Sequence, residues 1–198
     1  MRAYYDRRAP EYDDWWLGRG LFADRERPGW REETDALVRT IAALPPARTL
    51  DVACGTGFLT RHLPGPVFGL DQSEKMLAVA REQAPRVQFV RGDALALPFP
   101  DDSFERVFAS YFYCHLEEDE RHRFLAEARR IAPELVVVAS RWNEDEPRER
   151  WEERVLKDGS RWGVYKRVFD PEQLADELGG GETLFAGRWF VAVRSPAT

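Results

Sequence analysis

Three aspartates that lie in or directly after short apolar segments are the residues of this chain best suited to bind a ligand. They are Asp51, Asp71 and Asp93, and a glycine-rich turn at residues 53–57 follows the first. Carboxylates accept hydrogen bonds from hydroxyls and amines, and glycine lets the backbone approach a ligand closely. Asp71 lies 14 residues after Gly57, a position suited to holding the two hydroxyls of a ribose. The pattern predicts a site for a ligand with hydroxyl and amine donors.

The sequence of the glycine-rich turn distinguishes between two kinds of nucleotide ligand. A dinucleotide-binding turn has the form G-x-G-x-x-G, and its third glycine allows close packing of helix and strand near the pyrophosphate. Here Gly55 and Gly57 are present, but Thr60 stands at the third position. Asp51 would also repel a pyrophosphate, whereas it would attract a ligand that bears an ammonium and a sulfonium. A nicotinamide-dependent reductase is therefore the weaker alternative.

One histidine could take part in proton transfer. His115 ends the segment 110–115, which follows the fourth apolar run. Because histidine titrates near neutral pH, this residue could act as a general base toward an acceptor hydroxyl. It could instead cap a helix that begins near Glu117, or line the site without titrating. His62 and His122 are predicted to lie on helix surfaces, and scattered histidines of this kind predict no metal site.

Apolar segments that alternate with helical patterns must position these residues. Strands are expected at residues 49–52, 67–70, 87–90, 104–109 and 134–139. Helices are expected around residues 37–44, at 58–63, after Ser73 and at 116–131. Five strand–helix units in a row are typical of an α/β fold with a doubly wound, Rossmann-like, mostly parallel sheet, and ligands bind at the carboxyl ends of such strands.

The last third of the chain changes in character. Residues 141–168 are rich in charge and tryptophan, which predicts an insertion over one end of the sheet, and residues 144–153 are expected to form a solvated helix face. A helix is predicted to begin at Asp170, and residues 183–193 are predicted to form a closing hairpin around Gly187. A seven-stranded sheet with an antiparallel C-terminal hairpin is therefore expected. We predict one domain, residues 1–198, made of an N-terminal helical lid (1–46), a binding core (47–140), a substrate-side insertion (141–168) and a C-terminal helix and hairpin (169–198).

Several ordered motifs resemble the class I S-adenosylmethionine-dependent methyltransferases, of the small-molecule type related to the ubiquinone and menaquinone biosynthesis enzymes. Residues 50–57, 69–73 and 91–95 resemble the first three motifs of that family, and the resemblance covers roughly residues 1–140. The chain departs from the pattern at Ala53, where many members have glycine, and at residues 132–134, where proline-glycine-glycine is common. No N-P-P-Y stretch follows the fourth strand, so methylation of base or protein amide nitrogens is not indicated.

The resemblance implies a cofactor and a reaction. The cofactor would be S-adenosyl-L-methionine, the product S-adenosyl-L-homocysteine, and the reaction an in-line methyl transfer to a small, aromatic or apolar acceptor. Asp71 would hold the ribose, while Asp93 and the next backbone amide would meet the adenine. The cofactor-binding residues would be Asp51, Ala53, Gly55, Gly57, Asp71, Gln72, Met76, Asp93, Ala94, Ser110, Tyr5 and Tyr12. The acceptor would contact Tyr111, Tyr113 and Trp142.

Composition narrows the remaining alternatives. The net charge is −6, with 35 acidic and 29 basic residues, and the arginines are interleaved with acids, so nucleic acid is not an expected partner. No apolar run approaches the ~20 residues of a bilayer span, and the polar N-terminus predicts a cytoplasmic protein rather than an exported one. We expect reduced cysteines and a monomer or homodimer. A non-catalytic accessory protein that binds the cofactor remains an alternative.

Overall fold

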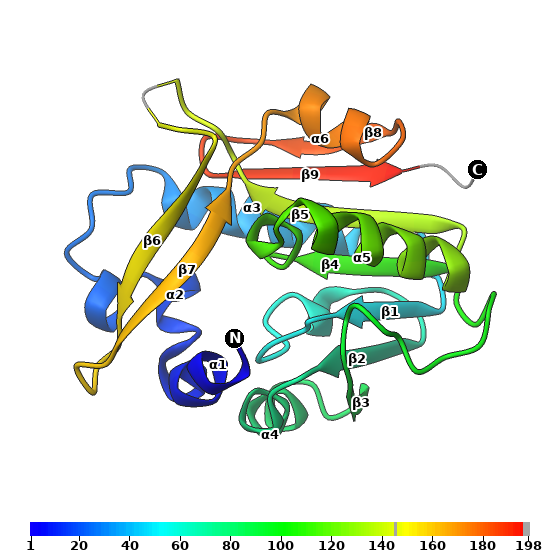
Figure 1. The fold of residues 1–198 in the computed structure, drawn as a ribbon, viewed down its shortest axis with the longest axis horizontal. Helices are drawn as coiled ribbons and strands as arrows, with labels where there is room; N and C mark the ends of the chain where they lie inside the picture. Colours follow the sequence, from blue (N-terminus) through cyan, green and yellow to red (C-terminus); the bar gives the residue numbers. More distant parts are fainter. Residues whose placement is uncertain (145, 196–198) are drawn as a thin grey trace.

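The computed structural model describes residues 1–144 and 146–195 and has a seven-stranded sheet at its centre (Figure 1). The strand order is β3-β2-β1-β4-β5-β9-β8. The strands from β3 to β5 pair in parallel, while β9 is antiparallel to both β5 and β8. The predicted doubly wound sheet with an antiparallel C-terminal hairpin is confirmed. The strands are β1 Thr49–Val52, β2 Val67–Asp71, β3 Gln88–Arg91, β4 Arg106–Ser110, β5 Glu134–Ser140, β8 Glu182–Ala186 and β9 Phe190–Ser195.

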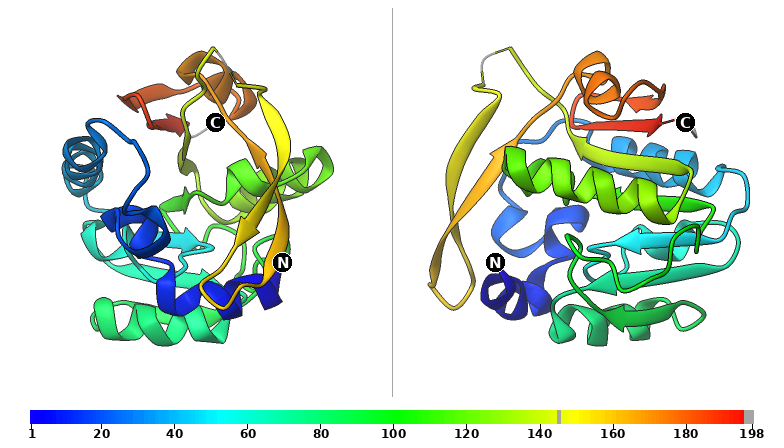
Figure 2. Two further views of the ribbon diagram at one scale, coloured as in Figure 1. Left: turned by 90° about the vertical axis from the view of Figure 1, so that its left-hand side faces the viewer. Right: turned by 45° about the vertical axis from the view of Figure 1, so that its right-hand side comes forward.

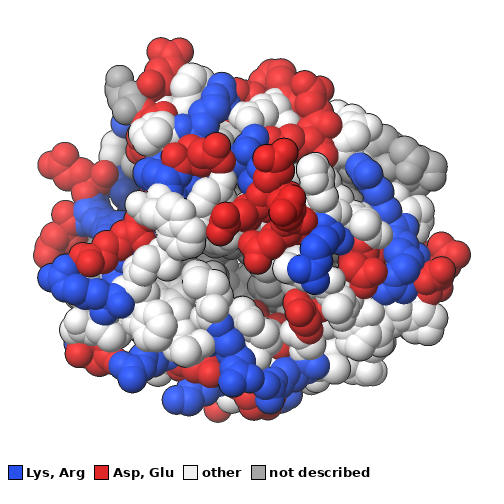
Figure 3. Space-filling model, viewed as in Figure 1, with Lys and Arg blue, Asp and Glu red and all other residues white. Residues whose placement is uncertain are grey.

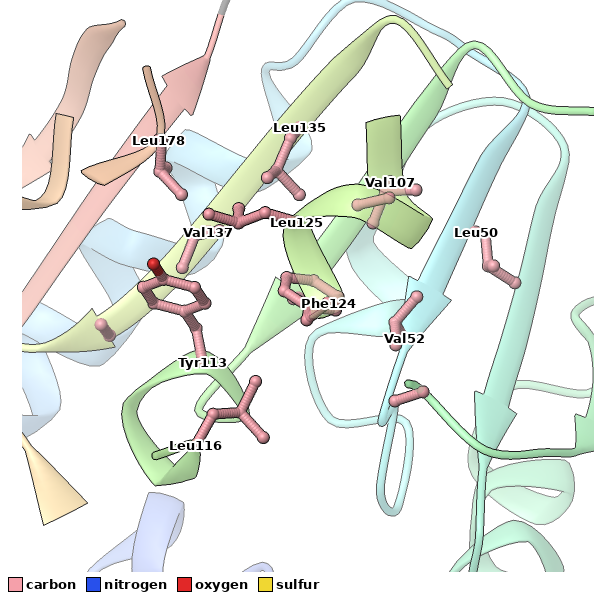
Figure 4. Packing of buried hydrophobic residues seen from close by; sticks show 14 of the residues in the cluster. Leu50, Val52, Val107, Tyr113, Leu116, Phe124, Leu125, Leu135, Val137 and Leu178 are labelled. Carbon is pink, nitrogen blue, oxygen red and sulfur yellow. The ribbon is translucent and has the colours of Figure 1, made fainter. Parts of the chain in front are cut away.

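The central strands are buried on both faces because helices cover both faces. On one face, Val137 of β5 packs in a cluster with Phe124 and Leu125 of helix α5 (Glu118–Ile131), as Figure 4 shows. On the other face, Val136 belongs to a cluster with Leu37 of helix α3 (Trp30–Ala42). Each fully buried side chain of this size stabilises the fold by about 1.5–3 kcal/mol. The continuous apolar run of β5 is thus explained by contacts in both directions.

Helices α3, α4, α5 and α6 lie against the sheet, and local sequence patterns determine where some of them begin. They are α3 Trp30–Ala42, α4 Glu74–Gln83, α5 Glu118–Ile131 and α6 Pro171–Glu177. The predicted cap of α4 is present, since the Ser73 hydroxyl accepts a hydrogen bond from the Met76 N–H at 3.1 Å. Helix α5 begins two residues later than predicted, because Glu117 and Glu120 form a capping box there.

One of the expected helices is not formed. The segment after β1 contains only the short 3₁₀ helix η3, Thr60–His62, where a helix over residues 58–63 was predicted. The chain leaves that turn through the sequence Leu63-Pro64-Gly65-Pro66, which has no room for further helical turns. Between β3 and β4 the described chain forms turns, where no helix was predicted. The doubly wound topology is kept without a full helix after β1 or β3.

The N-terminal segment lies at the carboxyl ends of the parallel strands (Figure 1). It forms the helices α1 Arg2–Arg8 and α2 Asp14–Leu17 and the 3₁₀ helices η1 Ala9–Glu11 and η2 Gly20–Phe22. Tyr4 of α1 is 1% exposed and packs with Leu156 and Val164 of the later insertion. The first residues of the chain and the insertion therefore pack together beside the sheet.

The insertion is a β-hairpin, so the predicted solvated helix over residues 144–153 is wrong. Strands β6 Glu149–Val155 and β7 Arg161–Arg167 pair with each other in a separate two-stranded sheet, which Figure 2 shows beside the N-terminal helices. Exposure alternates along β6, with Arg150, Glu152 and Arg154 turned inward and their neighbours exposed. This period of two is the signature of a strand with one covered face. A charged composition alone suggested a helix, but the alternation decides the structure.

Candidate functional site

A cavity of about 290 Å³ lies between the carboxyl ends of the strands and the N-terminal helices. Ten of the residues predicted to bind a ligand line it: Tyr5, Tyr12, Ala53, Gly55, Asp71, Gln72, Asp93, Ala94, Tyr111 and His115. They come from segments far apart in the sequence, and the parallel sheet brings them to one edge. The position agrees with the general rule that ligands bind at the carboxyl ends of such strands.

The turn after β1 forms the floor of this cavity. Ala53, Gly55 and Gly57 all adopt the left-handed conformation, with φ of 57°, 56° and 79°. Glycine is the residue that adopts such angles without strain, which explains two of the three positions. Tyr12 lies against the turn, because a Cβ built on Gly55 would meet the Tyr12 ring at 3.5 Å. Tyr12 and the backbone of the turn therefore lie side by side in the wall of the cavity.

Asp71 ends β2 and points into the same cavity. Its carboxylate accepts hydrogen bonds from the backbone N–H groups of Gly55 at 3.0 Å and Ser73 at 2.8 Å. Burial raises the pKa of Asp71, and these backbone donors oppose the rise. A carboxylate has about four acceptor positions, so acceptor capacity remains for a ligand. Asp71 both fixes the turn and offers a charged acceptor to the cavity.

Asp93 lies after β3 at the other side of the cavity. It is exposed, and its carboxylate accepts a hydrogen bond from the Leu95 N–H at 2.9 Å. Ala94 lines the cavity beside it. The bond fixes the direction of the short loop that presents both residues. Asp71 and Asp93 therefore converge on one cavity, as their placement after neighbouring strands predicts.

Asp51 lies in a smaller adjoining cavity, not in the main one. That cavity shares Tyr12 and Ala53 with the main one and is also lined by Ser110. One carboxylate oxygen of Asp51 accepts a hydrogen bond from the Thr60 hydroxyl at 2.6 Å. Its Oδ1 atom and the Ser110 hydroxyl are buried and have no hydrogen-bond partner within the described residues. Two free buried oxygens beside the turn suit a ligand with an ammonium group.

The protonation of Asp51 should be visible in the stability of the protein. Burial raises its pKa from the ordinary value to about 8. Between roughly pH 4 and pH 8 the folded state therefore holds a proton that the unfolded state releases, and the free energy of unfolding falls as the pH rises. We expect Asp51→Asn to reduce this fall, measured by urea unfolding at pH 5 and pH 8. Asp24→Asn, at an exposed position, is the control, and an unchanged slope in Asp51→Asn would contradict the assignment.

Hydrogen bonds tie the N-terminal segment over the cavity. The Ser73 hydroxyl donates to Asp6 of α1 at 2.6 Å, and the Thr56 hydroxyl and the Gln83 amide both donate to Asp13. These bonds connect the covering segment to the turn after β1 and to helix α4. They keep Tyr5 and Tyr12 over the ligand-binding residues.

His115 lines the cavity in a single tautomer. Its Nδ1 atom lies 2.7 Å from the backbone carbonyl oxygen of Tyr165 in β7. Because a carbonyl oxygen only accepts, the proton sits on Nδ1, and Nε2 keeps its lone pair. Burial lowers the pKa of His115 to about 4, so the imidazole is neutral at physiological pH. The alternative role as a helix cap is wrong, since Glu117 caps α5.

Four of the predicted residues line neither the main cavity nor the smaller one that adjoins it. Gly57 and Met76 are buried, and neither lines the main cavity. The Tyr113 hydroxyl donates to Glu177 at 3.2 Å, and Trp142 lies against the guanidinium of Arg148. Alternation along a continued strand predicted Tyr113 beside Tyr111, but the chain turns at Tyr111, whose φ is 54°, into a 3₁₀ helix.

Other cavity residues were not anticipated from the sequence. Phe112, Leu116 and Glu120 line the main cavity, and Arg154 and Lys166 line a narrow space next to it. The last two face inward from the β6–β7 hairpin. The signal that could have found Arg154 is the alternation of charged residues along β6, which places positions 150, 152 and 154 on one face.

Comparisons with known proteins agree with this site. A family model for a methyltransferase domain matches residues 49–133. A demethylmenaquinone methyltransferase from Renibacterium salmoninarum is 34% identical over 134 residues, which are 66% of this chain and 53% of that protein. The solved DhpI-SAH complex is 26% identical with a TM-score of 0.75, and the alignment covers 98% of this chain and 94% of that one. In its motifs, its matched domain model and its fold, the chain is similar to the class I S-adenosylmethionine-dependent methyltransferases. This confirms the resemblance found in the sequence.

A second solved structure, the DhpI-SAM-HEP complex, has a similar fold. It is 25% identical with a TM-score of 0.76, and the alignment covers 98% of this chain and 95% of that one. The methyltransferase spans about half the length of the curated relatives it matches. None of its helices within the described ranges is long and apolar enough to cross a bilayer.

Proposed function

We propose that this methyltransferase moves the methyl group of S-adenosylmethionine to a small acceptor by in-line displacement. The observation that carries the proposal is the convergence of Asp71, Asp93 and the left-handed turn at residues 53–57 on one cavity beneath Tyr12. The aromatic side chains of Tyr5, Tyr111 and Phe112 on its wall favour an acceptor with a flat or apolar part. The names of the curated relatives make a demethylmenaquinone-type quinone one candidate.

The residues present fit the cofactor. Asp71 would accept hydrogen bonds from the ribose hydroxyls, and Asp93 with the Ala94 backbone would meet the adenine. The unpartnered Asp51 and Ser110 oxygens lie where they could accept hydrogen bonds from the cofactor's ammonium group. When bound, S-adenosylmethionine supplies a methyl group that its sulfonium already activates. Gly57 would contribute through the left-handed backbone of the turn, and Met76, fully buried in α4, would contribute only indirectly.

The protein would contribute mainly by positioning and by excluding water. Holding the reacting groups in line can supply about 7–11 kcal/mol of a barrier. The N-terminal segment covers the cavity through the Asp6 and Asp13 hydrogen bonds, which restricts access of water. Nε2 of His115, free of a proton, could accept one from an acceptor hydroxyl as general base.

The role of His115 can be tested separately from cofactor binding. We expect His115→Ala to leave the affinity for S-adenosylhomocysteine unchanged and to lower turnover by about 100-fold, at the low end of the range for general bases, because its low pKa makes it a weak base. Turnover of the wild type should be level at neutral pH and fall only as the pH drops through about 4, where the imidazole gains a proton. Calorimetry and a pH–rate profile check these points. A fall centred near ~6.5 would contradict the buried, neutral state.

The decisive experiment for the function is incubation with S-adenosylmethionine and a panel of aromatic, quinone and acidic acceptors, followed by mass spectrometry. The proposal expects an acceptor to gain one methyl group and S-adenosylhomocysteine to form in equal amount. Tight binding of S-adenosylhomocysteine with no methylated product would favour the accessory protein instead. Thermal stabilisation by NADH and not by S-adenosylhomocysteine would favour the reductase.

A further inference from the structure

A second cavity lies beyond Tyr111, away from the predicted cofactor residues. It has a volume of about 430 Å³ and is enclosed by the N-terminal segment, the end of β5 and the β6–β7 hairpin. A narrow cavity of about 40 Å³ lies between it and the main cavity. The narrow cavity shares Tyr111 and His115 with the main cavity, and it shares Tyr111, Arg154 and Lys166 with the large one. The narrow cavity, which His115 lines, is therefore a neighbour of both larger ones.

The second cavity is lined by an excess of basic side chains. Six of them contribute to its wall: Arg25, Arg27, Arg141, Arg150, Arg154 and Lys166. Its acidic side chains are Glu26, Glu146 and Glu152. The narrow cavity adds Arg8 and has no acidic side chain in its wall. This excess is unusual in a chain whose net charge is −6, and on the face shown in Figure 3 basic and acidic side chains are instead interspersed.

The acids of the cavity do not neutralise this cluster. Glu152 is shared between Arg150 and Arg154, and Arg150 also pairs with Glu146. Within residues 1–144 and 146–195, Arg8, Arg141 and Lys166 form no ion pair with a carboxylate. Positive charge therefore remains at the junction of the narrow and the large cavity.

Some nitrogen atoms of these basic side chains are buried without a hydrogen-bond partner. The Nη1 atom of Arg141 and the Nε atom of Arg154 are buried and have no hydrogen-bond partner within the described part of the chain. The Arg154 side chain is only 17% exposed. Burial lowers the pKa of Lys166, and Glu152 opposes that change. Within the described residues Lys166 pairs with no carboxylate, and Arg154 shares Glu152 with Arg150. An anion that enters this space would therefore gain both charge pairing and free donors.

We propose, building on the methyltransferase function proposed above, that the acceptor carries an oxyanion and that Arg154 and Lys166 hold this group beside His115. A guanidinium presents N–H donors in a fork that matches two oxygens of a carboxylate or phosphate-type group, and the lysine adds a point charge. The flat or apolar part of the acceptor then lies along Tyr111 toward the main cavity. The site favours acidic small molecules over neutral ones, because an anion pairs with the charges of Arg154 and Lys166 and a neutral molecule does not.

Binding of aromatic probes tests the proposal without turnover. Calorimetry with benzoate, phenylphosphonate and neutral benzamide is carried out on the protein saturated with S-adenosylhomocysteine. We expect at least one of the two anions to bind at least tenfold more tightly than benzamide. Tighter binding of benzoate would indicate recognition of a carboxylate, and tighter binding of phenylphosphonate would indicate recognition of a phosphonate. Lys166→Met and Arg154→Gln should weaken that binding at least tenfold and leave the affinity for S-adenosylhomocysteine unchanged. Lys166 forms no ion pair within the described residues, so Lys166→Met should keep the fold intact. This variant therefore still tests the proposal if Arg154→Gln unfolds the protein.

The control variant is Arg161→Gln on the same hairpin. Arg161 is exposed and pairs with Glu153 away from the cavity, so anion binding should stay as in the wild type. Equal binding of benzamide and both anions, or anion binding that neither cavity variant weakens, would overturn the inference. Because saturation with S-adenosylhomocysteine is measured first, a failure of the proposed cofactor function is seen separately from a failure of the anion site.

Discussion

Replacing Asp71 by alanine should abolish binding of S-adenosylmethionine at micromolar concentrations. Two hydrogen bonds from ribose hydroxyls to a carboxylate contribute about 1.5–3 kcal/mol each, which corresponds to a loss of affinity of roughly 100- to 10,000-fold. The variant would also release the Gly55 N–H that orients the turn. Titration calorimetry with S-adenosylmethionine and S-adenosylhomocysteine measures the effect directly.

Two further variants separate charge from structure at this position. Asp71→Asn keeps the shape of the side chain and one acceptor oxygen, so its loss of affinity should be smaller than that of Asp71→Ala. Asp101→Ala, at an aspartate whose side chain is 74% exposed, should bind as the wild type does. Wild-type affinity in Asp71→Ala would remove the central support for the proposed cofactor site.

Replacing Glu134 by alanine should destabilise the fold by about 3 kcal/mol. Its partner is Arg106 of β4, whose side chain is 2% exposed. Besides this ion pair, the guanidinium donates to the Pro45 carbonyl oxygen at 3.0 Å. Without Glu134 a buried positive charge remains with one neutral acceptor, and an uncompensated buried charge is far more costly than a lost surface pair. Chemical unfolding at pH 7 measures the change.

A matched pair in the same sheet supplies the control. Glu182 pairs with Arg194 between β8 and β9, but their side chains are 63% and 29% exposed, so Glu182→Ala should cost at most about 1 kcal/mol. The double variant Arg106→Met with Glu134→Leu should regain much of the stability, because it removes the charge together with its partner. Equal costs for Glu134→Ala and Glu182→Ala would show that burial of Arg106 does not matter.

The sheet and the turn could be predicted because their signals are local. Short apolar segments define β1, β2 and β5, and glycine at positions 55 and 57 marks a left-handed turn. The rule that parallel strands end at one edge then brings Asp71 and Asp93 together without knowledge of any contact. These features need only a few neighbouring residues and one topological rule.

The rest of the site depends on contacts between distant segments. His115 obtains its tautomer from Tyr165, 50 residues later in the chain, and no local pattern announces that contact. The alternation that predicted Tyr113 in the cavity fails because Tyr111 adopts a positive φ, which is uncommon for a residue other than glycine. The hairpin of β6 and β7 was taken for a helix because its charged residues were weighed by composition and not by spacing.

The side-chain bonds that anchor the first two helices have a consequence for the rate of turnover. In the proposed complex the cofactor would lie next to Tyr5 and Tyr12, and its departure would be eased when Asp6 and Asp13 release Ser73, Thr56 and Gln83. We therefore expect departure of the spent cofactor, and not the transfer step, to limit how often the enzyme cycles, as happens in many enzymes with a closing segment. Evolution could then adjust the speed of this enzyme by altering its first fourteen residues and leave the sheet untouched.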